Sequence, residues 1–594
     1  MIERRLLSPR SARLSLAAAL VCGACHAATP PAPAPAGVER PTVPATFPTG
    51  WRIPAGGKAT FAEHEMVVAN GPLAAQAGLE ILAAGGNAAD AAVATGFAMA
   101  VVYPAAGNIG GGGFAVIRMA NGKTAALDYR EIAPRAATRD MYLDPATGEL
   151  TKKSVVGHLA SGTPGSVAGL LETLDRFGTM KRAAVMAPAI RLARGFVVDA
   201  ALARSLKADS SLICRFSGCA TFFPNGHALK AGDTLHQPDL AHTLELISAQ
   251  GAKGFYRGEV ARAIATEERR GDGIITERDL AEYHTAWRTP VRATYHGHTL
   301  ISMPPSSSGG TTIVETLNIL DAFGAPPPSG SVQSLHELLG AFQLAFIDRN
   351  AYIADPDVIK VPTAKLVDPK YAREQRARLT DGRHVPTQSL APGLDVKEGT
   401  HTTHYSVVDR FGNAVATTTT INGGYGSGVW VPGGGFFMNN EMDDFAAQPG
   451  KPNMYGLVQG EANAVGPGKR MLSAMSPTIV LDPHGAVLLV IGSAGGPRII
   501  TGVAEIILNV IDHHMSLYDA MAAPRVHFQG LPDTVAMERG GIAQPVLDSL
   551  TAMGWRFSAG NGASSSPVAI RRVANGWEGL FDPRTSGGVA GRSP

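Results

Sequence analysis

The pattern of the chain changes at Thr402, and this change constrains the fold more than any other feature of the sequence. Between about residues 159 and 379, apolar residues recur at helical spacing between proline-rich interruptions. After Thr402 the pattern is that of strands, with residues 404–409 and 414–421 on either side of a glycine-containing turn. Neither part has a pattern that indicates a complete domain with its own core. We therefore predict a single layered α+β unit in which both parts contribute to one core.

Local signals place the first elements. Residues 73–84 have apolar positions at helical spacing and stop at Gly85 and Gly86, a usual helix end. Asn87 then caps a second apolar helix that runs to about Val102. The two are predicted to form a tightly packed helical hairpin.

Strand hairpins follow in both parts of the chain. Residues 114–119 and 124–129 flank an Asn-Gly turn, the strongest short hairpin signal. Residues 478–481 and 487–491 flank an Asp-Pro-His-Gly turn. The glycine run at 107–113 precedes a strand, whereas a dinucleotide-binding loop follows one, so we interpret this run as backbone that passes close to other backbone.

Composition argues against a nucleic-acid partner. The chain has 52 Lys and Arg against 50 Asp and Glu, a net charge of +2, and no basic block. Its 69 glycines and 41 prolines among 594 residues indicate a globular protein rich in loops and tight turns.

The N-terminus has the layout of a secretory signal. Residues 1–27 contain several arginines, a short apolar run at 14–21 and small residues around the end. We expect a secreted or periplasmic protein cleaved near Ala27. The alternative is a lipid anchor on Cys22 or Cys25, but neither has a leucine three positions before it. Residues 28–50, rich in Pro and Ala up to residue 46, predict a tether without a packing role. No membrane-spanning helix is expected, because no apolar segment reaches about 20 residues.

Removal of the signal leaves two cysteines, Cys214 and Cys219, on either side of a four-residue turn. In an oxidising compartment a local disulfide is expected, and a pair of ordinary thiols is the alternative. We expect no metal site and no cofactor. His336-Glu337 lacks the second histidine that a zinc-protease helix needs. The chain also lacks a Gly-x-Ser-x-Gly elbow and a phosphate-binding Gly-x-x-x-x-Gly-Lys loop.

The threonines at 402, 403 and 417–420 would by themselves only indicate strands, since Thr favours them. Their context resembles the γ-glutamyltranspeptidase family. In the second part the resemblance extends to the segments 439–445, 473–478 and 492–496. In the first part it extends to residues 107–114, 128–131, 161–165 and 303–310. These motifs stand in family order from about residue 62 to Arg584.

The resemblance implies an N-terminal nucleophile hydrolase with a four-layer αββα sandwich, made as one chain that cuts itself between His401 and Thr402. Residues 51–401 would form the large subunit of a heterodimer and residues 402–594 the small one. The freed α-amine of Thr402 would act as the base for its own hydroxyl, because such an amine has a pKa of about 7.7 to 8.0 against about 10.4 for lysine. Thr420 would support the nucleophile, and Thr403 is a second candidate for that supporting role.

The same resemblance implies the reaction. Thr402 would attack the γ-glutamyl amide of glutathione or a related compound, and water or an amino acid or peptide acceptor would resolve the acyl-enzyme. The backbone amides of Gly495 and Gly496 would stabilise the oxyanion. Arg130 would pair with the α-carboxylate of the substrate. A list of further binding residues follows from the family pattern: Asn422, Glu441 and Asp444 for the α-amino group, Ser473 for the α-carboxylate, and Tyr455 in a lid at 449–460.

One position departs from the family pattern. Two adjacent serines commonly donate to the α-carboxylate, and here the second is Ala474. Loss of a hydrogen bond to a charged group costs roughly 1.5 to 3 kcal/mol, so substrate preference becomes an open question. The rival hypotheses are an acylase for glutaryl or cephalosporin side chains and a non-catalytic binding protein with the same scaffold.

Overall fold

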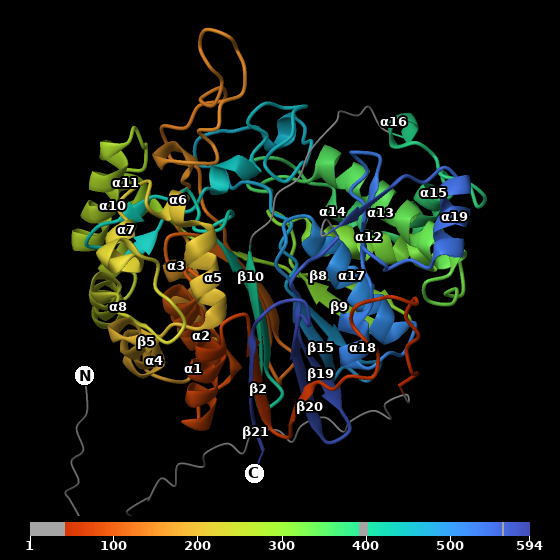
Figure 1. Ribbon diagram of the computed structural model, residues 1–594, viewed down its shortest axis with the longest axis horizontal. Helices are drawn as coiled ribbons and strands as arrows, with labels where there is room; N and C mark the ends of the chain where they lie inside the picture. Colours follow the sequence, from red (N-terminus) through yellow and green to blue (C-terminus); the bar gives the residue numbers. More distant parts are fainter. Residues whose placement is uncertain (1–41, 391–401, 561–562, 594) are drawn as a thin grey trace, which may run out of the picture.

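Two seven-stranded sheets lie face to face, and a layer of helices covers the outer face of each (Figure 1). This computed structural model describes residues 42–390, 402–560 and 563–593. The fold is the expected four-layer αββα sandwich. The predicted signal at 1–27 and the His401 side of the cleavage bond lie outside the described residues.

The first sheet combines strands from both sides of Thr402. From edge to edge it contains β21 (Gly588–Arg592), β2 (Glu65–Ala69), β10 (Thr403–Val408), β11 (Ala414–Thr420), β3 (Gly112–Arg118), β4 (Thr124–Tyr129) and β7 (Ala286–Arg288).

The second sheet is mixed in the same way. Its order is β1 (Thr60–Ala62), β20 (Gly576–Phe581), β19 (Val568–Val573), β15 (Val487–Gly492), β14 (Thr478–Leu481), β9 (His298–Ser302) and β8 (Val291–Tyr295). Three small sheets lie outside the sandwich and comprise β5 (Phe196–Val197) with β6 (Thr234–Leu235), β12 (Trp430–Val431) with β13 (Phe436–Phe437), and β16 (Val526–His527) with β17 (Val535–Glu538) and β18 (Phe557–Gly560).

Helices on the left of Figure 1 belong to the layer that covers the first sheet. This group is α1 (Pro72–Ala83), α2 (Ala88–Val102), α3 (Ser166–Phe177), α4 (Arg182–Arg194), α5 (Ala200–Ala208), α6 (Ser210–Ile213), α7 (Cys219–Phe222), α8 (Pro238–Gln250), α9 (Lys253–Tyr256), α10 (Gly258–Arg270) and α11 (Glu277–Glu282).

Helices on the right of Figure 1 belong to the layer that covers the second sheet. This group is α12 (Gly309–Asp321), α13 (Val332–Tyr352), α14 (Thr363–Leu366), α15 (Pro369–Arg376), α16 (Thr387–Leu390), α17 (Arg498–Ile511), α18 (Leu517–Ala522) and α19 (Gln544–Ala552).

Both faces of the first sheet are buried, and the strand period of two assigns each residue to one core. On β2, Val67 and Ala69 pack in the core under α1 and α2, whereas Met66 and Val68 pack in the core shared with the second sheet. Strands buried on both faces are continuously apolar rather than alternating, which β2 and β3 show.

The predicted helical hairpin is confirmed. The Asn87 side chain accepts hydrogen bonds from the backbone amides of Ala89 and Asp90, and the Asp90 side chain accepts one from the Asn87 amide, forming a capping box. The predicted hairpins β3–β4, β10–β11 and β14–β15 are also present. The middle of the chain, expected to be mostly helical, additionally supplies β7, β8 and β9 to the two sheets.

The glycine run at 107–113 lies against backbone, as predicted. A Cβ on Gly110 would lie 2.1 Å from the Phe437 carbonyl oxygen, and one on Gly111 would lie 2.1 Å from that of Thr420. Only glycine permits this approach.

The prediction of a tether without a packing role is wrong for its described end. The Val43 amide donates a hydrogen bond to the His514 carbonyl at 2.8 Å, and Ala45 packs against the core that the two sheets share. A nearly charge-free segment rich in Ala and Pro can bury small apolar groups on a neighbouring surface, which its composition did not reveal.

The structure contains a disulfide between Cys214 and Cys219, with Cα atoms 4.3 Å apart. It joins the end of α6 to the start of α7, near the loop that carries β12 and β13.

Asp409 ties the turn between β10 and β11 to the first turn of α2. Its Oδ2 accepts hydrogen bonds from the Ala88 amide at 2.8 Å and from Asn413 Nδ2 at 2.6 Å. Its Oδ1 accepts from the amides of Phe411 and Asn413, both at 2.9 Å. The carboxylate is buried and lies at a helix N-terminus, where negative charge is favourable.

We therefore expect Asp409→Ala to destabilise the protein by about 3 kcal/mol or more, because it leaves several buried N–H groups without an acceptor. Asp409→Asn, which keeps one side-chain acceptor, should cost less. The midpoint of thermal unfolding measures both, and an Asp409→Ala protein that melts with the wild type contradicts the assignment.

Candidate active site

The pairing of β10 with β11 brings two threonines together. The register places Thr403 opposite Thr419, so the next residues outward are Thr402 and Thr420. Both are buried and both line the same pocket. Residues 18 positions apart in the chain are thus held at one end of two central strands.

The pocket gathers residues from both parts of the chain. Its lining contains both polar and apolar residues. The lining residues are Arg349, Thr402, Thr420, Asn422, Glu441, Asp444, Tyr455, Leu457, Leu472, Ser473, Ala474, Met475, Gly496, Pro497 and Ile499. Most of the predicted site residues are therefore brought together.

Thr420 is held in a defined orientation. Its Oγ1 accepts a hydrogen bond from the Asn422 amide at 2.7 Å, and its carbonyl accepts one from Asn108 Nδ2 at 2.8 Å. Asn422 has a φ of 71°, in the left-handed region that Asn tolerates better than most residues. The Thr420 hydroxyl proton can accordingly be donated to a neighbour.

Thr403 and His404 are directed elsewhere. The Thr403 hydroxyl donates to Asn70 Oδ1 at 3.0 Å, and Thr403 does not line the pocket. His404 contacts the hydroxyls of Thr418 and Ser406, and burial lowers its pKa to about 3. The neutral imidazole therefore fills the space between the sheets.

Gly495 and Gly496 follow β15 and precede the first turn of α17. Their φ values are 134° and 56°. A Cβ on Gly496 would lie 2.6 Å from Cδ1 of Tyr455. Gly496 lines the pocket, Gly495 does not, and the positive end of the α17 dipole lies beside both.

Tyr455 closes one side of the pocket. Its hydroxyl donates to the Asn422 carbonyl at 2.9 Å. The neighbouring Met454 amide donates to Asp443 Oδ2 at 2.8 Å, and Gln529 Nε2 donates to the Gly456 carbonyl at 3.1 Å. These bonds dock the predicted lid segment over the pocket.

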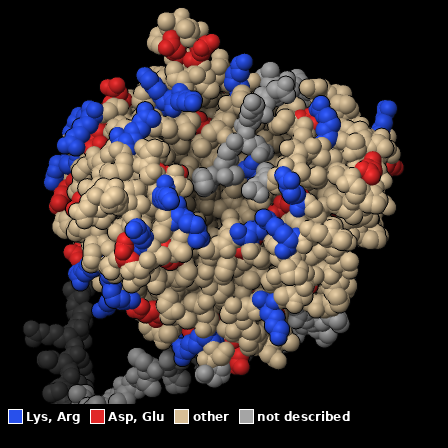
Figure 2. Space-filling model, viewed as in Figure 1, with Lys and Arg blue, Asp and Glu red and all other residues tan. Residues whose placement is uncertain are grey.

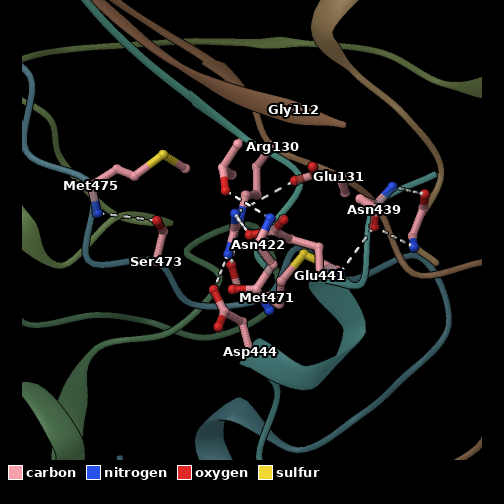
Figure 3. Close-up of polar contacts among 12 residues, drawn as sticks. Gly112, Arg130, Glu131, Asn422, Asn439, Glu441, Asp444, Met471, Ser473 and Met475 are labelled. Carbon is pink, nitrogen blue, oxygen red and sulfur yellow. Dashed lines mark hydrogen bonds and ion pairs between the residues drawn. The ribbon is translucent and has the colours of Figure 1, made fainter. Parts of the chain in front are cut away.

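Arg130 is the centre of a buried charge cluster (Figure 3). Its Nη1 and Nη2 contact the carboxylates of Glu441 and Asp444 respectively, and Nη1 lies 3.5 Å from Oε2 of Glu131. Nε donates to the Met471 carbonyl at 3.3 Å. Arg130 does not line the pocket, so direct contact between Arg130 and a substrate carboxylate stays a prediction.

The three carboxyl groups outnumber the guanidinium that they surround. Burial raises the pKa of Glu131 to about 7 and that of Asp444 to about 6, while Arg130 opposes both shifts. Burial likewise raises the pKa of Glu441, and Glu131 and Asp444 add to this shift by repulsion. The cluster therefore favours a proton or another cation.

Asn439 joins the segments that form this cluster, as Figure 3 shows. Its Nδ2 donates to the carbonyls of Gly110 and Gly162, and its Oδ1 accepts from the amides of Gly162 and Glu441. One side chain thus connects the glycine run, the 161–165 motif and the 3-10 helix η3 (Glu441–Asp444).

Ser473 lines the same pocket as Glu441. Its Oγ accepts from the Met475 amide at 3.1 Å, which leaves its hydroxyl proton for another acceptor. Ala474 beside it presents a methyl group to the pocket.

Two polar residues at the site were not among the site residues predicted from the sequence. Glu131 belongs to the quoted 128–131 motif, which marked the segment but not this side chain. Arg349 lies on α13 and lines the pocket. No motif surrounds it, so the sequence offered no signal for it.

One face of the molecule carries both signs of charge (Figure 2). Figure 2 shows Lys and Arg spread over one face with Asp and Glu among them, and a hollow near the centre. Within residues 42–390, 402–560 and 563–593, no helix is both long and apolar enough to span a membrane. In the same described ranges, no cluster of three or more His, Cys, Asp or Glu side chains is arranged to hold a metal ion.

Comparison with known proteins places these features in a family. The family model described as gamma-glutamyltranspeptidase matches residues 74–592. A glutathione hydrolase proenzyme of Escherichia coli is 43% identical over 588 residues, covering 98% of this chain and 99% of that protein.

Two solved structures are similar as well. A cephalosporin acylase from Bacillus halodurans superposes with a TM-score of 0.79 at 29% identity, covering 92% of this chain and 98% of that one. A Helicobacter pylori gamma-glutamyltranspeptidase chain has a TM-score of 0.53 at 40% identity, covering 56% of this chain and 95% of that one.

The raised pKa of Glu131 predicts how stability depends on pH. Between about pH 4.5 and 7 the folded protein retains a proton that the unfolded chain has lost, so stability falls as pH rises through this window. One such group contributes a slope of about 1.4 kcal/mol per pH unit.

Glu131→Gln mimics the protonated side chain and should flatten this slope. We expect its thermal midpoint to match the wild type at pH 5 and to fall less between pH 5 and 8. The exposed Glu149→Gln is the control and should follow the wild type. Parallel profiles for Glu131→Gln and wild type would show that Glu131 is ionised throughout.

Proposed function

The chain belongs to the γ-glutamyltranspeptidase family, and from this premise we propose that it is a self-cleaving enzyme that transfers the γ-glutamyl group of glutathione or a related amide to water or to an amino acid or peptide. The observation that carries the proposal is the pocket itself. Thr402 and Thr420 meet there with Asn422, Glu441 and Asp444.

Self-cleavage would begin at the Thr402 hydroxyl. Its Oγ1 attacks the preceding carbonyl carbon of His401, the peptide C–N bond breaks, and the acyl group moves to oxygen as an ester. Water then hydrolyses the ester and releases a carboxylate on His401 and a free amine on Thr402. The Thr420 hydroxyl, whose oxygen accepts a hydrogen bond from the Asn422 amide, would donate its proton to the reacting oxygen.

The topology supports a stable pair of fragments after the cut. β10 pairs with β2 on one side and with β11 on the other, so a strand of the small fragment lies between strands of both fragments. The second sheet is interleaved in the same way by β9 and β14. Residues 51–401 and 402–594 would therefore remain together as a heterodimer.

The catalytic cycle uses the group that cleavage creates. The free α-amine of Thr402 accepts the hydroxyl proton while Oγ1 attacks the γ-carbonyl carbon of the donor. The amides of Gly495 and Gly496, beside the N-terminus of α17, stabilise the oxyanion. The amine returns the proton to the leaving nitrogen, the acyl-enzyme forms, and water or an acceptor amine releases the γ-glutamyl group.

Recognition of the glutamyl end follows from the charge of the pocket. The excess of buried carboxylates favours the α-ammonium group, which Asn422, Glu441 and Asp444 would hold. As Glu441 and Asp444 turn to the ammonium, the Arg130 guanidinium becomes available to the α-carboxylate. Ser473 can donate its hydroxyl proton to the same carboxylate.

We also propose that the enzyme acts outside the cytoplasm, after removal of residues 1–27. The alternative of a lipid anchor on Cys22 or Cys25 is tested by the mass of the mature N-terminal peptide. The disulfide between Cys214 and Cys219 agrees with an oxidising compartment.

A glutaryl or cephalosporin acylase is the second candidate. The methyl of Ala474 in the pocket and the structural similarity to a cephalosporin acylase favour it. The buried Glu441 and Asp444 argue against it, because a donor without an α-amino group would leave them without a cation.

Processing is the first test. We expect purified wild-type protein to give two bands on a denaturing gel, with the smaller one beginning at Thr402. Thr402→Ala should remain a single chain, because no hydroxyl is present to attack the peptide, and Thr402→Ser should be cleaved. N-terminal sequencing of each band measures this. An uncut wild type would favour the non-catalytic binding protein.

Donor choice is the second test. We expect kcat/KM for γ-glutamyl-p-nitroanilide to exceed that for glutaryl-p-nitroanilide by roughly tenfold to a hundredfold, the worth of a hydrogen bond to a charged group. Asp444→Asn should narrow this ratio by slowing the γ-glutamyl donor alone. A preference for the glutaryl donor would identify the acylase instead.

A further inference from the structure

Arg349 is a buried cation at the edge of the pocket. It lies in the last turn of α13, where the carbonyl end of the helix favours positive charge. Its side chain is inaccessible to solvent, and the residue lines the pocket. Burial lowers the pKa of its guanidinium to about 10, so the group remains charged near neutral pH.

The hydrogen-bond partners of Arg349 are neutral. Nε donates to the Ser308 hydroxyl at 2.9 Å, and Nη1 donates to Asn350 Oδ1 at 2.7 Å. Among the residues that the structure describes, Nη2 has no hydrogen-bond partner. A buried guanidinium donor without an acceptor is costly, and its position at a pocket points to a ligand that supplies one.

Arg130, in contrast to Arg349, has its charge balanced by carboxylates of the protein itself. It has three carboxylates around it, and two of them, Glu441 and Asp444, bond to its Nη atoms. Asp444 acts on Arg349 only through its field, because its hydrogen bond goes to Arg130. Arg349 is therefore the cation at this pocket with no carboxylate bonded to it in the described part of the chain.

Arg349 is coupled to the wall that contains Ala474. The Ser308 hydroxyl accepts from Arg349 and donates to the Ser473 carbonyl at 2.6 Å, and the Ser308 amide donates to the same carbonyl at 2.8 Å. The guanidinium is thus linked through Ser308 to the backbone of Ser473, the residue before Ala474, where the family pattern has a second hydroxyl.

We propose that Arg349 is a specificity-determining residue whose Nη2 donates a hydrogen bond to the α-carboxylate of the donor, in place of the hydroxyl that Ala474 lacks. The inference rests on the proposed function. A guanidinium N–H bonded to a carboxylate is at least as strong as a serine hydroxyl bond, because both partners are charged. The enzyme would then still bind the α-carboxylate of the donor although residue 474 is alanine.

Three small competitive inhibitors separate the groups of the donor. L-Glutamate has the α-carboxylate and the α-ammonium, glutarate lacks the ammonium, and 4-aminobutanoate lacks the α-carboxylate. Inhibition constants against γ-glutamyl-p-nitroanilide would be measured on the cleaved wild-type enzyme, on Arg349→Gln and on Arg349→Lys. Arg571→Gln, a buried arginine remote from the pocket, is the matched control.

We expect Arg349→Gln to raise the inhibition constants of L-glutamate and glutarate by roughly tenfold to a hundredfold, as for the loss of a hydrogen bond to a charged group. The constant for 4-aminobutanoate should stay within about threefold of wild type, because that ligand never used the bond. The inhibition constants of Arg349→Lys should lie between those of the wild type and those of Arg349→Gln. In both variants kcat should change less than KM. Equal weakening of all three inhibitors would show a purely structural role and overturn the proposal.

Substitution of Ala474 gives an independent measurement that leaves Arg349 intact. If Arg349 already serves the carboxylate, Ala474→Ser should change L-glutamate inhibition of the otherwise wild-type enzyme by less than about threefold. In the Arg349→Gln background it should recover most of the loss. Tenfold tighter binding from Ala474→Ser alone would show that the carboxylate lacks a donor and would overturn the proposal, even where Arg349→Gln fails to mature.

Failure of this proposal is distinguishable from failure of the proposed function. A wild-type enzyme that is cleaved at Thr402 and hydrolyses γ-glutamyl-p-nitroanilide establishes the function whatever Arg349 does. A wild type without this activity refutes the function before any Arg349 variant is compared.

Discussion

The site depends on the register between β10 and β11 in the middle of a sheet that is buried on both faces. Because side chains alternate along a strand, a slip of one residue would turn Thr402 away from the pocket and bring Thr403 into it. The neighbours β2 and β3 pair with β10 and β11 from outside and prevent such a slip. The glycine run at 107–113 permits these close pairings, since a Cβ on Gly113 would lie 2.4 Å from the Thr418 carbonyl oxygen.

Buried charges of both signs lie at the pocket. Glu131, Glu441 and Asp444 crowd one guanidinium, so this cluster favours a cation. Ser473 and Arg349 line the same pocket, where the Ser473 hydroxyl proton and the Arg349 Nη2 are donors that favour an anion. Burial strengthens both preferences because it removes the water that would otherwise solvate each charge. Tyr455, which is buried and bonded to the Asn422 carbonyl, lines the same pocket.

Much of the scaffold was predictable because its signals are local. The Asn87 cap, the double glycine after α1 and the Asn-Gly turn between β3 and β4 each act within a few residues, and each element was found where they indicated. The strands β7, β8 and β9 were missed for the opposite reason. They lie in a mostly helical stretch, β7 and β8 are edge strands, and β9 is next to β8, so their pairing rather than their own sequence defines them.

The sequence by itself determined the motif that begins at Thr402, the threonines and glycines that accompany it, and the α+β class, because these follow from residue types and short spacings. The tertiary structure alone decided which charges face one another. It set Arg130 beside Glu441 and Asp444, brought Arg349 from the last turn of α13 to the pocket that Ser473 and Ala474 also line, and packed Ala45 against the core. Contacts between residues hundreds of positions apart arise only when the sheets and helices pack, and no local pattern encodes them.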